Sequence, residues 1–205
     1  RFPKKEDGTI DEVEAERMLD YAIESGVTYI DTAYPYHDGE SEPFVGRVLK
    51  KYKREDFYLA TKLPIFKIDS LEQAKEIFEE QMKRLDVDYV DFYLLHALNK
   101  DTWKKVIDLN IISYCEELKK QGRIKNFGFS FHDDYEVFEE IINYRDWDFC
   151  QIQLNYIDTD IQAGMKGYKL TEEKNVPLVI MEPIKGGALA SLSDDIEKVF
   201  TDYNQ

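Results

Sequence analysis

The chain has 205 residues, 43% of them hydrophobic and 34% charged, which fits a folded globular chain with a substantial core and excludes a disordered or fibrous one. With 27 Lys and Arg against 42 Asp and Glu, the net charge of −15 disfavours binding to nucleic acid or to an anionic membrane. No apolar run reaches the roughly 18 to 20 residues of a membrane span, and no basic-then-apolar leader opens the chain. We therefore expect one cytoplasmic domain over residues 1–205.

Six short β-branched or aromatic runs alternate with segments of helical periodicity. A helix is predicted over Asp11–Ser25, and the runs then follow at intervals of about one βα unit, roughly 30 residues each. The predicted strands are Tyr29–Ala33, Phe57–Leu63, Val90–His96, Ile124–Ser130, Phe149–Tyr156 and Leu178–Ile184.

Several segments between and after these runs carry helix signals. Ser70 and Gln73 form a capping-box pattern at the start of an amphipathic segment. A single helix is predicted over Trp103–Leu118, where apolar residues recur at i, i+3 and i+4, and Gly122 is placed to end it. A last amphipathic helix is predicted over Asp194–Tyr203.

Alternating strands and helices predict a parallel sheet with helical cover, either doubly wound or closed as a barrel. No G-x-G-x-x-G pattern follows any predicted strand, so the usual support for a doubly wound dinucleotide fold is absent. A barrel needs eight strands, whereas six are visible, and the first and last helices have no strand before and after them. We therefore predict the α/β class, with a (β/α)8 TIM barrel that lacks its first and eighth strands.

The two cysteines, Cys115 and Cys150, lie in a predicted helix and a predicted strand. They do not have the close spacing of a metal site or a redox pair. We expect small buried side chains rather than a disulfide.

Polar residues stand at the carboxyl ends of all six predicted strands, where parallel architectures bind ligands. Strand ends meet solvent and are often polar for that reason alone, but six together indicate a site. In chain order these residues are Asp31, Lys62, His96, Ser130, Gln151 with Asn155, and Glu182.

The first three of these residues, together with a tyrosine in the first loop, suit acid–base chemistry. Asp31 would compensate a buried Lys62, and the ammonium would stabilise the phenolate of Tyr36, so that this tyrosine can act as a general acid. His96 could hydrogen-bond the same substrate oxygen and polarise a carbonyl. The residues also fit a structural ion pair and a capped core histidine, and residue types alone do not separate the two interpretations.

These residues lie in segments that resemble the aldo-keto reductase family over essentially the whole chain. YIDTAYPY, YLATKL, LDVDYVDFYLLH, IKNFGFS and QIQLNY are similar to its successive barrel-strand signatures. The resemblance implies a (β/α)8 barrel that binds a nicotinamide cofactor, usually NADPH with NADH as an alternative, without a Rossmann fold. It also implies an NAD(P)H-dependent oxidoreductase that reduces a small aldehyde or ketone. Its catalytic tetrad would be Asp31, Tyr36, Lys62 and His96, with Tyr36 as proton donor.

The resemblance also implies contacts to the cofactor, and no metal. Ser130 and Gln151 would hold the nicotinamide carboxamide, and the MEPIKGG segment would lie along the pyrophosphate, where glycine allows close approach of backbone NH groups. The implied cofactor-binding residues are Asp31, Ser130, Gln151, Met181, Glu182, Pro183, Ile184, Gly186 and Gly187.

Four features depart from the pattern of the family or of its subgroup. Met181 stands where the family stacks an aromatic ring on the nicotinamide, and Phe131 stands where it usually has Asn. The first strand, and the eighth strand with the elements that bind the 2′-phosphate, are not in this sequence, so the 205 residues alone can be inactive. MEPIKGG with QIQLNY looks like a subgroup whose longer members carry an iron–sulfur tail, and no such cysteine cluster is present.

Two alternatives to a reductase stay open. One is a barrel that binds the nicotinamide cofactor and regulates without turnover. The other is a metal-dependent barrel hydrolase using Asp31 and His96, for which only three histidines, His37, His96 and His132, are available. The sequence names neither the carbonyl substrate nor the oligomeric state.

Overall fold

The computed structural model describes residues 2–192 and 194–202. In this part of the chain, six strands form one sheet in the order β1 to β6, and each strand pairs in parallel with the next. The elements are α1 (Glu12–Glu24), β1 (Tyr29–Asp31), η1 (Tyr36–Gly39), α2 (Ser41–Leu49), η2 (Arg54–Asp56), β2 (Tyr58–Leu63), η3 (Ile65–Lys67), α3 (Leu71–Leu85), β3 (Val90–Leu98), α4 (Lys100–Asp108), α5 (Ile111–Lys120), β4 (Ile124–Phe131), α6 (Tyr135–Tyr144), β5 (Phe149–Gln153), α7 (Gly164–Lys174), β6 (Leu178–Met181), η4 (Lys185–Gly187) and α8 (Asp194–Asp202).

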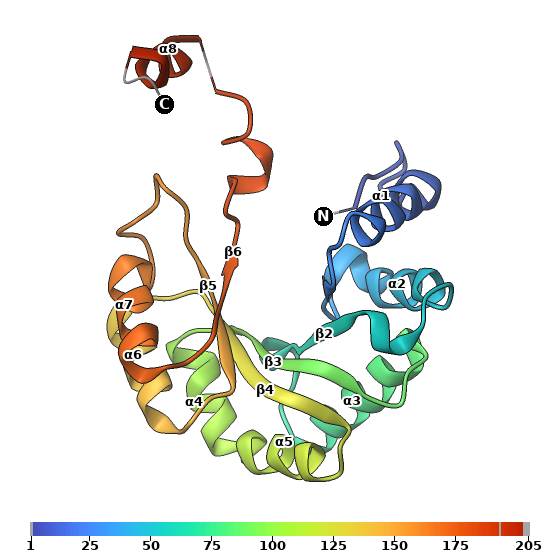
Figure 1. Ribbon diagram of the computed structural model, residues 1–205. Coiled ribbons are helices and arrows are strands. Elements are labelled where there is room, and N and C mark those ends of the chain that lie inside the picture. Colours follow the sequence, from blue (N-terminus) through green and yellow to red (C-terminus); the bar gives the residue numbers. More distant parts are fainter. Residues whose placement is uncertain (1, 193, 203–205) are drawn as a thin grey trace.

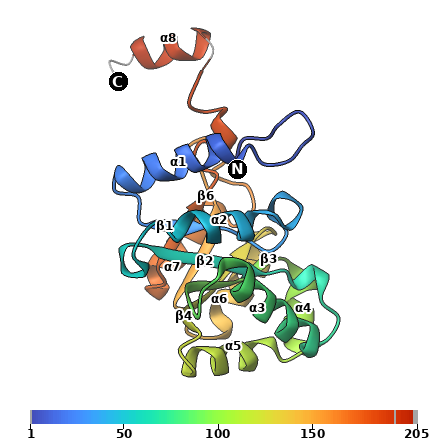
Figure 2. The same cartoon turned by 90° about the vertical axis from the view of Figure 1, so that its right-hand side faces the viewer.

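The sheet is strongly curled, with helices on its convex side (Figure 1). The edge strands β1 and β6 lie on opposite arms of the curl, with an open side between them. Figure 2 shows α1 across the end of one arm beside α2, and the ion pair between Arg47 and Glu12, at 2.5 Å, joins the two helices. Parallel strands in sequential order with helices outside are the architecture of a (β/α)8 barrel, here with six strands in the described residues. The predicted fold class is confirmed.

The main core fills the space between the sheet and its helices. Side chains alternate between the two faces of a strand, so every second residue of β4 points outward. Phe129 packs 4.8 Å from Trp147, and Phe131 packs 5.3 Å from Phe138 of α6, measured between ring centroids. Phe131, which follows Ser130 where the family usually has Asn, is therefore buried on the helix side of the sheet and does not face the concave side.

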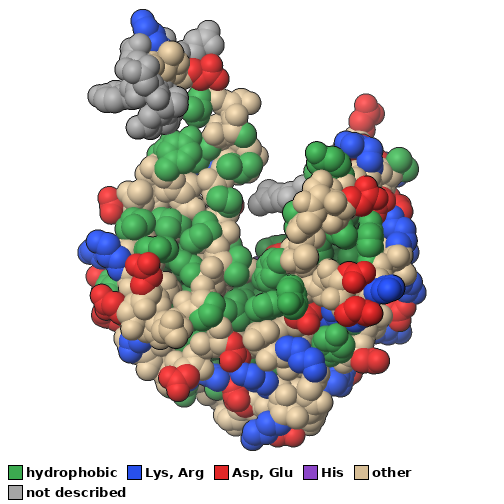
Figure 3. Space-filling model, viewed as in Figure 1, with side chains coloured by type: hydrophobic (Ala, Val, Ile, Leu, Met, Phe, Trp, Pro, Cys, Tyr) green, Lys and Arg blue, Asp and Glu red, His purple; other side chains and the backbone are tan. Residues whose placement is uncertain are grey.

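The concave face of the sheet carries a second, smaller apolar cluster. Ala60, Leu94 and Phe149 are its fully buried members, and Tyr29 and Phe92 pack against them with other partly buried side chains. Figure 3 shows hydrophobic side chains on the floor of the hollow between the two arms. The side chains two residues further along four of these strands, on the same face and toward the carboxyl ends, are polar ones singled out from the sequence: Asp31, Lys62, His96 and Gln151.

The helix predicted over 103–118 is wrong in one respect, because it is two helices, α4 and α5. Asn110 adopts a left-handed conformation (φ 56°, ψ 36°) between them, and this breaks the helical hydrogen bonding although the apolar pattern continues. The predicted helix end holds, because Gly122 follows α5 with φ 74°. The predicted capping box forms only in part: the Ser70 hydroxyl accepts from the backbone N–H of Gln73 at 3.2 Å, whereas the Gln73 side chain accepts from the N–H of Asp69 at 2.7 Å.

The last two strands end earlier than predicted, at Gln153 and Met181. Asn155 and Glu182 therefore lie in the loops that follow the strands. The final helix is described to Asp202, and Tyr203, its predicted end, lies outside the described residues.

Cys115 and Cys150 are free and fully buried, which confirms their prediction as small buried side chains. Burial raises the pKa of the Cys150 thiol to about 12. Among the described helices, none combines the length and the apolar character needed to cross a membrane.

Gly128 of β4 has no room for a side chain against the neighbouring strand β5. A Cβ atom there would lie 2.4 Å from the carbonyl oxygen of Phe149 and 2.7 Å from its ring. We predict that Gly128→Ala lowers the free energy of unfolding by about 1–3 kcal/mol, measured by chemical denaturation. Lys125→Ala, at an exposed position of the same strand, is the control and should change it by less than about 0.5 kcal/mol. Equal losses in both variants would contradict the steric explanation.

Candidate active site

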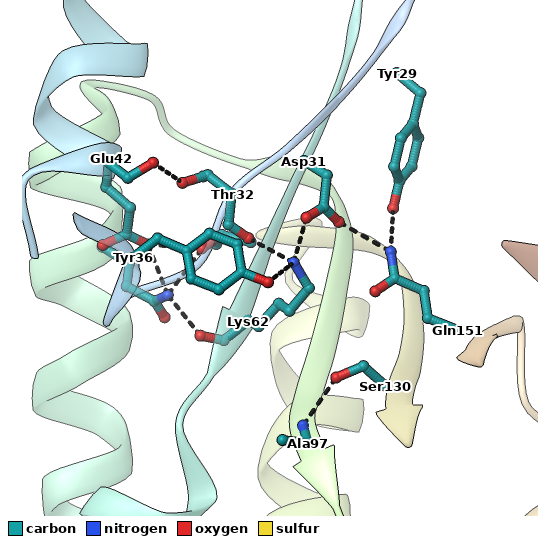
Figure 4. A network of polar contacts seen from close by, with 12 residues as sticks. Tyr29, Asp31, Thr32, Tyr36, Glu42, Lys62, Ala97, Ser130 and Gln151 are labelled. Atoms are coloured by element: carbon teal, nitrogen blue, oxygen red, sulfur yellow. Dashed lines mark hydrogen bonds and ion pairs between the residues drawn. The ribbon is translucent and has the colours of Figure 1, made fainter. Parts of the chain in front are cut away.

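Lys62 is the centre of a polar network on the concave face (Figure 4). Its side chain is 1% exposed, and its ammonium donates to the carboxylate of Asp31 and to the carbonyl oxygen of Thr32 at 2.9 Å. Asp31 ends β1 and Lys62 lies near the end of the neighbouring β2, so parallel pairing brings them together. The ion pair compensates a charge that would otherwise be costly to bury.

Tyr36 reaches this network from the loop after β1. Its hydroxyl lies 3.5 Å from Nζ of Lys62, and its ring stands edge-on to His96 with centroids 5.7 Å apart. The side chain is 38% exposed, in contrast to the buried lysine. The hydroxyl is therefore held beside a cation at a position that solvent or a ligand can reach.

His96 lies in β3 and belongs to the same group of side chains at the carboxyl ends of the strands. This group, which contains Asp31, Tyr36, Lys62 and His96, surrounds what we call the mouth of the sheet. His96 is buried, and only 8% of it is exposed. Burial, followed by the charges of Lys62 and His132, lowers the pKa of His96 to about 3. Its Nδ1 has no hydrogen-bond partner among the described residues. The ring is neutral at neutral pH, so it can form hydrogen bonds but carries no cationic proton to donate.

Gln151 joins the network from β5, on the opposite arm. Its Nε2 donates to the second carboxylate oxygen of Asp31 at 2.9 Å and to the hydroxyl of Tyr29 at 3.2 Å. Burial and the charge of Asp31 raise the pKa of Tyr29 above its ordinary value, which keeps this hydroxyl protonated. Oε1 of Gln151 is buried and has no hydrogen-bond partner in residues 2–192 and 194–202.

Ser130 lies beside Gln151, because the two residues are partners in the register of β4 and β5. Its hydroxyl oxygen accepts a hydrogen bond from the backbone N–H of Ala97 at 2.8 Å. Ala97 has a left-handed φ of 54°, within an irregular end of β3. The structure thus gathers the four tetrad residues, Ser130 and Gln151 at one mouth.

The rest of the predicted cofactor segment follows the neighbouring strand β6. Met181, at the end of β6, is half-buried, whereas Glu182, Pro183 and Ile184 are exposed. The loop then passes through left-handed conformations at Gly186 (φ 66°) and Gly187 (φ 101°). These residues follow the carboxyl end of β6, the strand next to β5. Within the described residues, no hydrogen bond joins them to the tetrad.

Three residues at the mouth were not found from the sequence. Tyr29 precedes Asp31 by two positions, so strand alternation could have placed it on the same face. Thr32 acts through its backbone carbonyl, which no sequence signal reveals. Phe66, in η3, packs 5.6 Å from the His96 ring and is 47% exposed.

Among the described residues, no group of three or more His, Cys, Asp or Glu side chains could hold a metal ion. The other two histidines bond elsewhere: Nε2 of His37 accepts from the N–H of Phe2 at 3.1 Å, and Nδ1 of His132 lies 3.2 Å from Oε1 of Gln162. The donor set that a metal-dependent hydrolase needs is therefore not assembled around Asp31 in this part of the chain.

Comparison with known proteins identifies the family. The model of the Aldo/keto reductase family matches residues 2–205. The chain belongs to this family.

Relatives within the family include proteins of known and unknown activity. The chain is 31% identical over 181 residues to the Bacillus subtilis protein described as an uncharacterized oxidoreductase, YqkF, covering 84% of this chain and 56% of that protein. It is 26% identical over 186 residues to an Escherichia coli NADH-specific methylglyoxal reductase, covering 80% and 54%. An aldo-keto reductase structure from Bacillus halodurans (holo form) superposes with a TM-score of 0.72 at 30% identity, covering 90% and 62%. The chain thus spans about half the length of these two curated relatives.

We predict a pH dependence of stability from His96. Its pKa is about 3 in the folded protein, against about 6.5 in an unfolded chain, so the unfolded state binds more protons between these values. Stability due to His96 is therefore complete above about pH 6.5 and decreases as the pH falls toward 3, by up to about 1.4 kcal/mol per pH unit. Urea unfolding should show that His96→Gln loses less stability on acidification than the parent protein. Gln121→Met, at an exposed position without a titrating group, is the control, and an unchanged pH slope in His96→Gln would contradict the prediction.

Proposed function

We propose that the protein containing this chain reduces a small aldehyde or ketone with a nicotinamide cofactor, and that Tyr36 donates the proton. The observation that carries the proposal is the Tyr36 hydroxyl, 3.5 Å from the Lys62 ammonium at an accessible mouth. A cation beside a phenol oxygen stabilises the phenolate left after proton transfer. The neutral state of His96 supports the assignment, because it leaves Tyr36 as the better placed acid.

When bound, the reduced nicotinamide supplies a hydride to the carbonyl carbon. Tyr36 gives its proton to the carbonyl oxygen as negative charge develops there, and Lys62 stabilises the resulting phenolate. Asp31 holds Lys62 in place through their ion pair. His96 orients the carbonyl oxygen through a hydrogen bond, which a neutral imidazole can donate from one ring nitrogen.

The residues of the mouth fit a nicotinamide group. Oε1 of Gln151 is a buried acceptor without a partner in the described residues, and the carboxamide of nicotinamide carries the N–H donors that it lacks. Ser130 would form a second hydrogen bond to this carboxamide, and Met181 would cover one face of the nicotinamide ring. The loop with Gly186 and Gly187 is open, because a Cβ atom at either glycine would have no other atom within 4 Å, and this suits close approach of a pyrophosphate.

We propose NADPH as the cofactor, with NADH as the alternative. The residues discussed above would contact the nicotinamide and the pyrophosphate. Both groups occur in NADPH and in NADH, so these residues accept either cofactor. A relative from Escherichia coli is named an NADH-specific methylglyoxal reductase, and this name supports a small reactive carbonyl compound as substrate. Because the chain spans about half of that relative, we propose the activity for the longest natural reading frame that contains it.

We predict that Tyr36→Phe lowers kcat for a reactive aldehyde such as methylglyoxal by about 10²- to 10⁴-fold, because the ring stays but the acidic proton is lost. Oxidation of NADPH or NADH, followed by absorbance in the longest natural reading frame, measures the effect. Tyr58→Phe, at an exposed position, is the matched control and should keep parental activity. Parental turnover in Tyr36→Phe would refute the assignment.

We predict that Gln151→Met raises the Kd of the reduced cofactor by about tenfold, because a buried amide acceptor for the carboxamide is removed. Titration calorimetry measures this without turnover. Gln121→Met, exposed at the end of α5, is the control and should bind as the parent does. An unchanged Kd in Gln151→Met would mean that the cofactor does not contact this amide.

A further inference from the structure

The loop that carries Tyr36, residues 32–40, is called the tyrosine loop below, and its backbone is strained. His37 (φ 51°) and Asp38 (φ 57°) both adopt the left-handed conformation, and Gly39 (φ 94°) follows them. Residues other than glycine are disfavoured in this conformation, so such a turn persists only where its surroundings hold it. Contacts from neighbouring elements must therefore fix the position of Tyr36.

One set of contacts holds Tyr34, two residues before Tyr36. The guanidinium of Arg84 from α3 lies over the Tyr34 ring, 4.2 Å from its centroid, and Nη1 lies 3.5 Å from the Tyr34 carbonyl oxygen. Glu80, one turn earlier on α3, accepts from the Tyr34 hydroxyl at 2.7 Å and from Nη2 of Arg84 at 2.6 Å. The ring, hydroxyl and carbonyl of Tyr34 are thus all held by one helix.

A second set of contacts begins at Glu42, which follows the loop in α2 and is fully buried. Its Oε1 accepts from the Thr61 hydroxyl at 2.6 Å and from Nε2 of Gln81 at 2.8 Å. Gln81 also donates to the backbone carbonyl of Lys62 at 3.0 Å. The other carboxylate oxygen of Glu42 lies 3.5 Å from Nη1 of Arg84. This one carboxyl group therefore links the backbone of Lys62 to the arginine that holds Tyr34.

Burying the carboxyl group of Glu42 away from water costs free energy. Burial raises the pKa of Glu42, while the hydrogen bonds from Thr61 and Gln81 and the charge of Arg84 act in the opposite direction. An apolar side chain would fill the space without this cost, but it would not connect Lys62 and Arg84.

We propose that Glu42 and Arg84 are positioning residues that set the Tyr36 hydroxyl against Lys62 from the helix side of the sheet. Neither residue touches the reacting atoms. The inference rests on the proposed function, in which Tyr36 donates the proton.

The first test compares two arginines of similar setting in the longest natural reading frame. Arg84→Met removes the contacts to Tyr34 and Glu42, and should lower kcat at least about tenfold while the Kd of NADPH stays within about twofold. Arg123→Met is the matched control. Arg123 pairs with Glu79 of α3 at 3.0 Å and lies 5.0 Å from the centroid of the Phe78 ring, away from the tyrosine loop. It should keep kcat within about twofold.

Two conservative variants separate charge from shape. Glu42→Gln keeps an oxygen acceptor for Thr61 and Gln81 but places no negative charge against Arg84, so kcat should fall by about three- to tenfold. Arg84→Lys keeps the charge but not the planar contact with the Tyr34 ring, and its kcat should lie between those of Arg84→Met and the parent.

Hydrogen–deuterium exchange over residues 34–40 gives a readout that does not need turnover. The turn contains backbone hydrogen bonds from Tyr36 to Ala33 and from Glu40 to His37, each 3.0 Å long. Exchange there should be at least about fivefold faster in Arg84→Met and Glu42→Gln, and unchanged in Arg123→Met. If Glu42→Gln exchanges faster in every segment, it is unfolded, and Arg84→Met decides the matter.

The outcomes are distinguishable from failure of the proposed function. If the parent protein reduces no carbonyl compound and exchange still rises in residues 34–40 of the variants, the positioning contacts stand and the reductase proposal fails. Unchanged exchange in Arg84→Met would overturn the inference. Parental kcat in Arg84→Met despite faster exchange, or an equal loss of kcat in Arg123→Met, would overturn it as well.

Discussion

A lysine ammonium buried on the concave face of a sheet needs a counter-ion, and the arrangement of the mouth follows from this requirement. Lys62 is 1% exposed, and Asp31 from the preceding strand pairs with it. An unpaired charge at this depth would cost several kcal/mol, so the pairing of β1 with β2 and the burial of Lys62 depend on each other. The tyrosine loop begins directly after Asp31, so the same ion pair also fixes the position of the loop's first residue relative to Lys62.

The curl of the sheet turns this local pair into a site. Asp31 lies in β1 and Gln151 in β5, four strands away, which in a flat sheet would be roughly 19 Å at about 4.8 Å per strand. In the structure, Nε2 of Gln151 is 2.9 Å from a carboxylate oxygen of Asp31. Only a sheet curved toward barrel closure permits that bond, so it joins the two arms across the concave face. One oxygen of the Asp31 carboxylate thus pairs with the Lys62 ammonium, and the other accepts a hydrogen bond from Gln151.

The sequence predicted what local patterns determine and missed what depends on contacts in space. Strand runs and their polar ends located Asp31 and Lys62, because strand alternation and parallel order suffice for that. The break at Asn110 was missed because the apolar pattern continues across it. Gln81 binds Glu42 and the Lys62 carbonyl at sequence separations of 39 and 19 residues, which no local pattern encodes. Its one signal was a polar side chain on the apolar face of α3.

Burial acts on two neighbouring basic side chains with different results, and this difference bears on which group can supply a proton. Lys62 has Asp31 as a counter-ion, whereas burial, Lys62 and His132 all act against a charge on His96. The histidine is therefore neutral and suited to orienting an oxygen, while the lysine is suited to stabilising an anion. In the proposed reaction, the acid that lies between them is neutral before it gives up its proton, and the lysine stabilises the anion that it leaves. A phenol meets both conditions, and Tyr36 places one there.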